Sequence, residues 1–155
     1  MNKRIWVLLL LAGCGGQEKP AGVLGTLEAA TAAEAWRIAG DPRKPGDYDY
    51  FAYSVISGPV SLSNSLRSEL TKTLWDPRIR SDNVHPCIPS PGVKVRYSRP
   101  NAAPLWIFFC FECHELFVYE DAAQQDHKGF DDAVGDLAAV MKKIFPNDAV
   151  IQGLK

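Results

Sequence analysis

Apolar side chains recur at strand spacing in the second half of the chain. Residues 93–97 alternate valine with charged or aromatic residues, which predicts a strand with valines inward and charges outward. Residues 105–111 are almost wholly apolar, as in a central strand covered on both faces. Residues 116–119 predict a short strand that forms a hairpin with this one. Residues 48–57 are rich in aromatic and β-branched side chains and predict another strand, which Gly58-Pro59 should end.

Helical spacing marks two amphipathic segments. Leucines at every fourth position from 62 to 74 form one stripe, which Ser61 or Ser63 can cap and Asp76-Pro77 should stop. The last helix ends at Pro146 and has charges that suit the helix dipole. Its apolar face comprises Phe130, Ala133, Val134, Leu137, Met141, Ile144 and Phe145. Residues 26–35 are rich in Ala and Glu and favour helix, although 36–38 could be extended.

Together these elements predict an α+β fold: an antiparallel sheet of four to five strands with helices packed on one face. We expect residues 26–155 to form a single domain. Residues 76–92 contain four prolines and therefore predict a long loop. Long ordered loops are either functional or tied down, and Cys87 within this one indicates a tie.

The first residues have the features of a secretory signal. Asn2, Lys3 and Arg4 form a polar, charged head, residues 5–11 are apolar, and small residues precede Cys14. The apolar run is far shorter than the ~20 residues of a membrane-spanning helix. The segment therefore predicts export and removal by cleavage.

Leu11-Ala12-Gly13-Cys14 closely resembles the lipobox of bacterial lipoproteins. The resemblance implies a signal peptide over 1–13, lipid on the thiol of Cys14, and a lipidated tether over 14–25. It also implies a membrane partner held through that lipid, in the cell envelope. Gly15, rather than Asp, follows the cysteine, which implies the outer membrane where two membranes are present.

Composition narrows the function of the 155-residue chain. It has 17 Lys and Arg against 18 Asp and Glu, with no basic stripe, so no nucleic-acid partner is expected. The chain lacks a G-x-S-x-G elbow, a phosphate-binding glycine loop and an H-E-x-x-H motif. His85, His114 and His127 are scattered along the chain, and Asp131-Asp132 suits a helix start. No catalytic residue and no bound metal are predicted.

Cys110-Phe111-Glu112-Cys113-His114 fits C-x-x-C-H, the attachment motif of c-type haem. Both thiols would bond to the haem and His114 would ligate the iron, with Met141, His85, His127 or no residue as the distal ligand. The motif follows a predicted buried strand, however, where side chains three apart point to opposite faces. Covalently bound haem c therefore remains an alternative to a cofactor-free protein.

Three other uses of the cysteines stay open. A thioredoxin-like redox role needs C-x-x-C at a helix start, where the helix dipole lowers the thiol pKa, and it is disfavoured because this motif follows a predicted strand. His85, Cys87, Cys110 and Cys113 could supply a Cys₃His zinc set, although an oxidising compartment disfavours free thiols. The preferred interpretation is a structural disulfide plus one buried thiol. If Tyr97 lies opposite Pro104 in the hairpin, Cys87 comes nearer to Cys113 than to Cys110. This register favours a Cys87–Cys113 bond.

A second resemblance concerns the last 70 or so residues. Cys87-Ile88-Pro89, then Gly92-Val93, then Cys110-Phe111-Glu112-Cys113, with Phe145-Pro146 at the end of the helix, resemble uncharacterised bacterial secreted and lipoprotein domains. It implies that the cysteines are part of a fold framework. The sequence thus predicts a non-enzymatic envelope lipoprotein that binds or scaffolds an unknown protein or small molecule, with a haem electron-transfer lipoprotein as the alternative.

Overall fold

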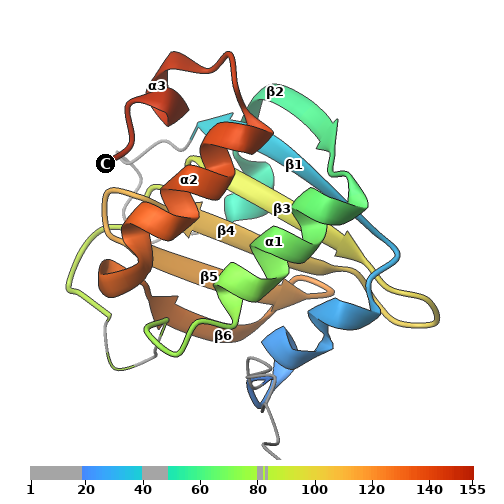
Figure 1. The fold of residues 1–155 in the computed structure, drawn as a ribbon. Coiled ribbons are helices and arrows are strands. Elements are labelled where there is room, and N and C mark those ends of the chain that lie inside the picture. The colour runs from blue at the N-terminus through green and yellow to red at the C-terminus, as the bar shows by residue number, and fades with distance from the viewer. Residues whose placement is uncertain (1–18, 40–48, 80–81, 83) are drawn as a thin grey trace, which may run out of the picture.

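The computed structural model describes residues 19–39, 49–79, 82 and 84–155, which form an α+β domain. Six antiparallel strands make one open sheet in the order β2-β1-β3-β4-β5-β6. Helices α1 and α2 lie side by side across one face of this sheet, and α3 follows α2 near the C-terminus (Figure 1). No helix within the described ranges is both long and apolar enough to span a bilayer.

The elements follow one another along the chain as short strands, helices and 3₁₀ turns. In order they are η1 (Val23–Ala29), β1 (Ala32–Ala39), η2 (Tyr50–Ala52), β2 (Ser54–Ser61), α1 (Asn64–Leu74), β3 (Val93–Ser98), β4 (Leu105–Cys110), β5 (Glu115–Glu120), β6 (Ala123–Gly129), η4 (Asp131–Ala133), α2 (Val134–Ile144) and α3 (Ala149–Gln152). The predictions of α1, β3, β4, β5 and α2 are confirmed. Ser63 caps α1, because its hydroxyl oxygen accepts the N–H of Leu66 at 3.2 Å.

The sheet has one strand more than the upper limit predicted, and β1 was partly predicted as helix. In β1, alternate alanines face the helices while Trp36 and Ile38 face the other side, a two-residue period that overrides the helix propensity of Ala and Glu. Only the 3₁₀ turn η1 is helical in this region. It begins within the predicted tether, and its Leu24 is buried.

The prediction that Gly58-Pro59 ends a strand was wrong. Both residues lie inside β2, joined by a cis peptide bond. A proline is tolerated there because β2 is an edge strand and its outer side needs no ladder hydrogen bond. The predicted strand also began too early, since Tyr50–Ala52 is a 3₁₀ turn and Tyr48 lies outside the described residues.

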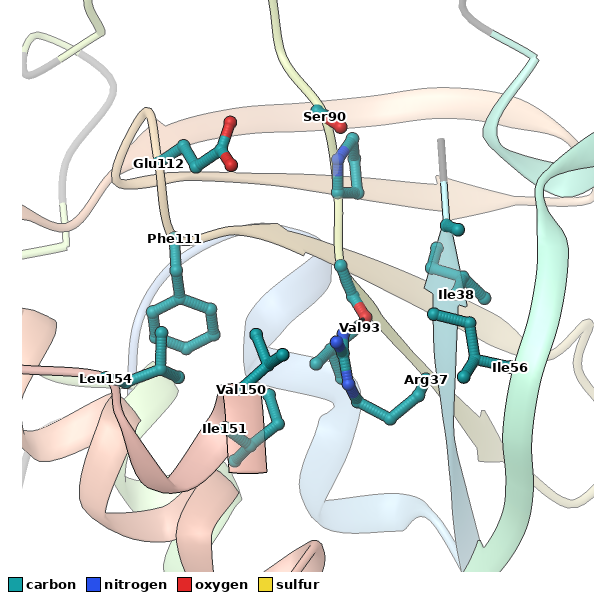
Figure 2. Close-up of a pocket in the computed structure, with 13 residues that line it drawn as sticks. Arg37, Ile38, Ile56, Ser90, Val93, Phe111, Glu112, Val150, Ile151 and Leu154 are labelled. Atoms are coloured by element: carbon teal, nitrogen blue, oxygen red, sulfur yellow. Dashed lines mark hydrogen bonds between the residues drawn. The ribbon is translucent and has the colours of Figure 1, made fainter. Parts of the chain in front are cut away.

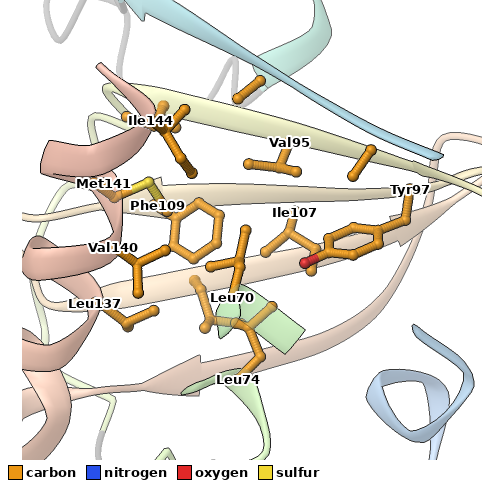
Figure 3. Packing of buried hydrophobic residues seen from close by; sticks show 14 of the residues in the cluster. Leu70, Leu74, Val95, Tyr97, Ile107, Phe109, Leu137, Val140, Met141 and Ile144 are labelled. Atoms are coloured by element: carbon orange, nitrogen blue, oxygen red, sulfur yellow. The ribbon is translucent and has the colours of Figure 1, made fainter. Parts of the chain in front are cut away.

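The main core lies between the sheet and the helices. Val95, Ile107 and Phe109 of the central strands meet Leu70 of α1 and Met141 of α2, all fully buried (Figure 3). The four-residue leucine stripe and the apolar face of the last helix are therefore both packing surfaces, as predicted. Each fully buried Leu, Phe or Met contributes about 1.5–3 kcal/mol through apolar burial.

A second, smaller core covers the opposite face of the sheet. Tyr50 of η2 packs on Phe108 and Phe117, with ring centroids 5.5 and 5.0 Å apart. Beside it the Lys94 ammonium lies 5.9 and 5.6 Å from the ring centres of Trp36 and Trp106. Lys94 is buried rather than facing outward as predicted, and burial lowers the pKa of its amine.

Candidate functional site

Cys87 and Cys113 form a disulfide, with Cα atoms 5.9 Å apart. The bond ties the 84–92 loop to the four-residue turn between β4 and β5, so the predicted pairing is confirmed. The hairpin register was one residue out, because Tyr97 pairs with Leu105 and not Pro104. That error is small enough to leave Cys113 nearest to Cys87. Cys14, the predicted lipidation residue, lies outside the described residues.

Cys110 keeps a free thiol at the end of β4, fully buried in the second core. Its sulfur accepts hydrogen bonds from the backbone N–H groups of Ser90 at 3.3 Å and Cys113 at 3.4 Å. Burial raises the pKa of the thiol, and these amide donors only partly oppose the rise. The expected buried thiol is thus present.

The positions of the cysteine sulfurs and of Met141 test the haem and zinc alternatives. Haem attachment needs both thiols of the C-x-x-C pair, but the Cys113 sulfur is bonded to Cys87. Met141, a suggested distal ligand, belongs to the main core on the other face of the sheet from Cys110. Within the described residues, no group of three or more His, Cys, Asp or Glu side chains is arranged to hold a metal ion.

The three histidines, which are scattered along the sequence, gather around two carboxylates beside the disulfide. His85 Nε2 lies 2.5 Å from one oxygen of Asp131, and His114 Nδ1 lies 2.7 Å from the other. The hydrogen bond to Asp131 raises the pKa of His85, and the His85 contact lowers the pKa of Asp131. Asp131 also stands at a helix start, as predicted, so one side chain has both roles.

Glu115 is the second carboxylate, and it is almost completely buried. One oxygen accepts the backbone N–H of His85 at 2.7 Å, and the other lies 3.1 Å from His127 Nε2. The His127 ring stacks on Phe117 with centroids 4.3 Å apart. These contacts provide hydrogen-bond partners for both buried oxygens of Glu115 and fasten the 84–92 loop to the β5–β6 end of the sheet. They describe a structural clamp.

A pocket of about 390 Å³ is lined by residues 90–92 at the end of the same loop. Phe111, Val150, Ile151 and Leu154 close one side of it, while Arg37, Ile38 and Ile56 come from β1 and β2 (Figure 2). Ser90 and Glu112 are its remaining polar side chains. A mainly apolar pocket of this size with a few polar groups has the character of a ligand site.

Arg37 is the polar centre of this pocket, and its side chain is only 8% exposed. Its Nε donates to Asp148 at 2.8 Å, and a terminal nitrogen donates to the carbonyl oxygen of Gly92. Although burial favours the neutral acid, hydrogen bonds from Ile151 N–H and Arg37 lower the pKa of Asp148. Asp148 also caps α3, so the ion pair fixes α3 against β1 and shapes the pocket.

Sequence reasoning missed both the clamp and the pocket. The sequence did contain evidence for the clamp. His85 precedes Cys87 by two residues and His114 follows Cys113, so the predicted disulfide already brought these histidines together. The pocket had little signal, because its lining comes from five separate segments and depends on α3, which was not predicted. The sequence held one hint of the pocket, because Arg37 is the one cation in the otherwise apolar second half of β1.

Comparison with protein-family models, with curated proteins and with solved structures finds no match to this chain.

Proposed function

We propose that this protein is an exported envelope lipoprotein whose domain is a non-enzymatic module that binds an extended apolar peptide segment along β2. The observation that carries the proposal is the pocket beside Ile56, next to an edge strand without charge. Lipid on Cys14 would hold the module at the membrane surface.

The two edges of the sheet differ in their protection against new strands. β6 carries Asp126, His127 and Lys128, and charged edges discourage pairing with other chains. β2 has no charged residue, and its Val55 and Ile56 are 52% and 57% exposed. Among the residues that the structure describes, its backbone pairs on one side only, with β1. An extended peptide can therefore add to residues 54–57 of β2 through main-chain hydrogen bonds, whereas Pro59 has no N–H to donate.

The pocket supplies the side-chain specificity that such a strand addition needs. Ile56 and Val150 are exposed and line the pocket, and Ile56 also lines a second hollow of about 370 Å³ that includes Phe145 and Asp148. Side chains of a strand alternate in direction, so alternate apolar residues of a bound peptide can reach these hollows. Arg37 is paired with Asp148, which leaves apolar contact as the main recognition.

The binding test uses a synthetic library of eight-residue peptides that alternate apolar and polar positions. Immobilised protein should enrich a subset, and titration of an enriched peptide should shift the NMR amide signals of β2 and of the pocket but not those of β6. Ile56→Lys should weaken binding at least tenfold. Gln125→Lys, on the exposed opposite edge, is the matched control and should bind as the wild type does.

Equal binding by Ile56→Lys, or shifts that map to β6, would contradict the proposed peptide site. Anchoring is tested separately in cells. The native chain should take up labelled fatty acid and Cys14→Ala should not. Retention of Met1 in the purified protein, or unchanged label in Cys14→Ala, would refute the anchor without affecting the peptide site.

A further inference from the structure

Three sulfurs lie in order from the interior to the solvent. Cys110 is 0% exposed, Cys113 is 4% exposed, and Cys87 is exposed in its loop. Cys113 is covalently bonded to Cys87 on one side, and its own backbone nitrogen is 3.4 Å from the Cys110 sulfur on the other. Cys113 is therefore the middle member, adjacent to both a disulfide partner and a free thiol.

The surroundings of Cys110 suit a sulfur that becomes an anion. Backbone N–H groups of Ser90 and Cys113 point at it, and such donors favour the thiolate over the thiol. Burial acts against these donors and raises the pKa of Cys110, so the group stays a protonated thiol at neutral pH. The disulfide and the thiol then coexist until the proton is removed.

We propose that Cys110, Cys113 and Cys87 form a thiol–disulfide exchange site that presents Cys87 to external disulfides. Local opening of the 111–114 turn admits water or hydroxide, which takes up the proton of the buried Cys110 thiol, and the thiolate then attacks the Cys113 sulfur. A Cys110–Cys113 bond forms as the Cys113–Cys87 bond breaks, and the electron pair leaves on Cys87. This step is an isomerisation with no net oxidation. The Cys87 thiolate then attacks a disulfide RSSR, forming a Cys87–SR bond and releasing RS⁻.

The geometry favours Cys87 as the leaving and presenting sulfur. A thiolate released at an exposed position is solvated, whereas one released in the second core is not. The 84–92 loop also remains in place after the bond breaks, because His85 is held through its ring by Asp131 and through its N–H by Glu115. The exposed thiolate thus stays beside the turn, and the step is reversible.

The test treats folded protein with the chromogenic disulfide 5,5′-dithiobis(2-nitrobenzoate), followed by acid quenching and non-reducing peptide mapping. The thionitrobenzoate adduct should be on Cys87, with a new Cys110–Cys113 bond. Release of the coloured thiolate should rise about tenfold for each pH unit below the pKa of Cys110, as the thiolate fraction does. Cys110→Ser, which keeps the Cys87–Cys113 bond, should release none. Tryptophan fluorescence monitors that the protein stays folded.

A second variant tests independently whether the sulfurs of Cys110 and Cys113 can come close enough to bond. Cys87→Ser leaves Cys110 and Cys113 as a pair, which should close to a disulfide on mild oxidation. An adduct on Cys110 with the Cys87–Cys113 bond intact would overturn the proposal. So would an absence of reaction in folded protein up to pH 9, or two thiols that stay free in oxidised Cys87→Ser.

Discussion

Asp131 is a single carboxylate that holds two histidines from different parts of the chain. His85 comes from the proline-rich loop, and His114 ends the turn after β4 with a left-handed φ of 53°. A non-glycine residue rarely adopts that conformation, and its side-chain contact with Asp131 helps to keep it there. The predicted role of Asp131 as a helix-start charge explains only part of what it does.

The Asp131 contact should make His85 more basic than a free histidine. A proton titration of the His85 ring by NMR should give a midpoint above 6.5, because the anionic neighbour favours the charged imidazolium. Asp131→Asn removes that charge and should return the midpoint toward 6.5. A midpoint that does not change in Asp131→Asn would show that the contact is not formed in solution.

The same pair gives the stability of the loop a defined pH dependence. Because the pKa of His85 is raised on folding, its contribution is complete below 6.5 and is lost as the pH rises through the folded value. Because the pKa of Asp131 is lowered, its contribution is lost as the pH falls through the folded value, below 3.8. The protection of the 84–92 amides, which is their exchange rate relative to the intrinsic rate of an unfolded chain at the same pH, should therefore be greatest in mildly acidic solution. This maximum in protection should disappear in Asp131→Asn.

At the scale of elements, most strands and both long helices could be predicted because apolar periodicity identified them. β6 could not, since Ala123–Gly129 is mainly polar and has little strand propensity. It pairs with β5 through the two-residue turn Asp121-Ala122, where both residues have positive φ as in a type I′ hairpin. That turn usually carries Asn-Gly or Asp-Gly. Because this chain has Asp-Ala instead, the sequence did not indicate a hairpin here.

This turn yields a stabilising substitution. Ala122 is exposed and has a φ of 63°, a conformation that costs a residue with a Cβ about 1–2 kcal/mol. Ala122→Gly removes that cost and increases the entropy of the unfolded chain by less, so it should stabilise the protein by roughly 0.5–1 kcal/mol. The midpoint of chemical denaturation measures the change, and Ala102→Gly in another exposed loop is the comparison. A lower midpoint would contradict the turn geometry.

The opposite substitution applies in the edge strand β2, whose register with β1 shifts near Arg37. Gly58 has a φ of 110°, and a Cβ there would lie 2.7 Å from the backbone oxygen of Ala35 in β1. Gly58→Ala should therefore destabilise the protein by about 1–3 kcal/mol and loosen β2 from β1. Gly135→Ala, where the added Cβ meets nothing within 4 Å and the site is helical, is the matched control and should be neutral or stabilising.

At the scale of the whole molecule, the fold class followed from the order of elements, but the pocket did not. Arg37, Phe111 and Val150 lie far apart in the sequence, and only the packing of α3 onto β1 through Asp148 brings them together. Periodicity identifies the buried face of each element but not which distant segments meet at an edge. The disulfide was predictable because a hairpin register converts sequence numbers into distances, and two cysteines remained close under that conversion.

That disulfide should account for a substantial part of the stability of the domain. It joins residues 26 positions apart, and the loop it restrains has few buried apolar side chains of its own. In the chain-entropy model, closing such a loop in the unfolded state stabilises the folded protein by about 3 kcal/mol. The double variant Cys87→Ser, Cys113→Ser should lose this amount in urea denaturation, and changing both residues prevents either one from pairing with Cys110. Reduced wild-type protein should match the double variant, while reducing agent should leave the double variant unchanged. A double variant as stable as oxidised wild type would contradict this estimate.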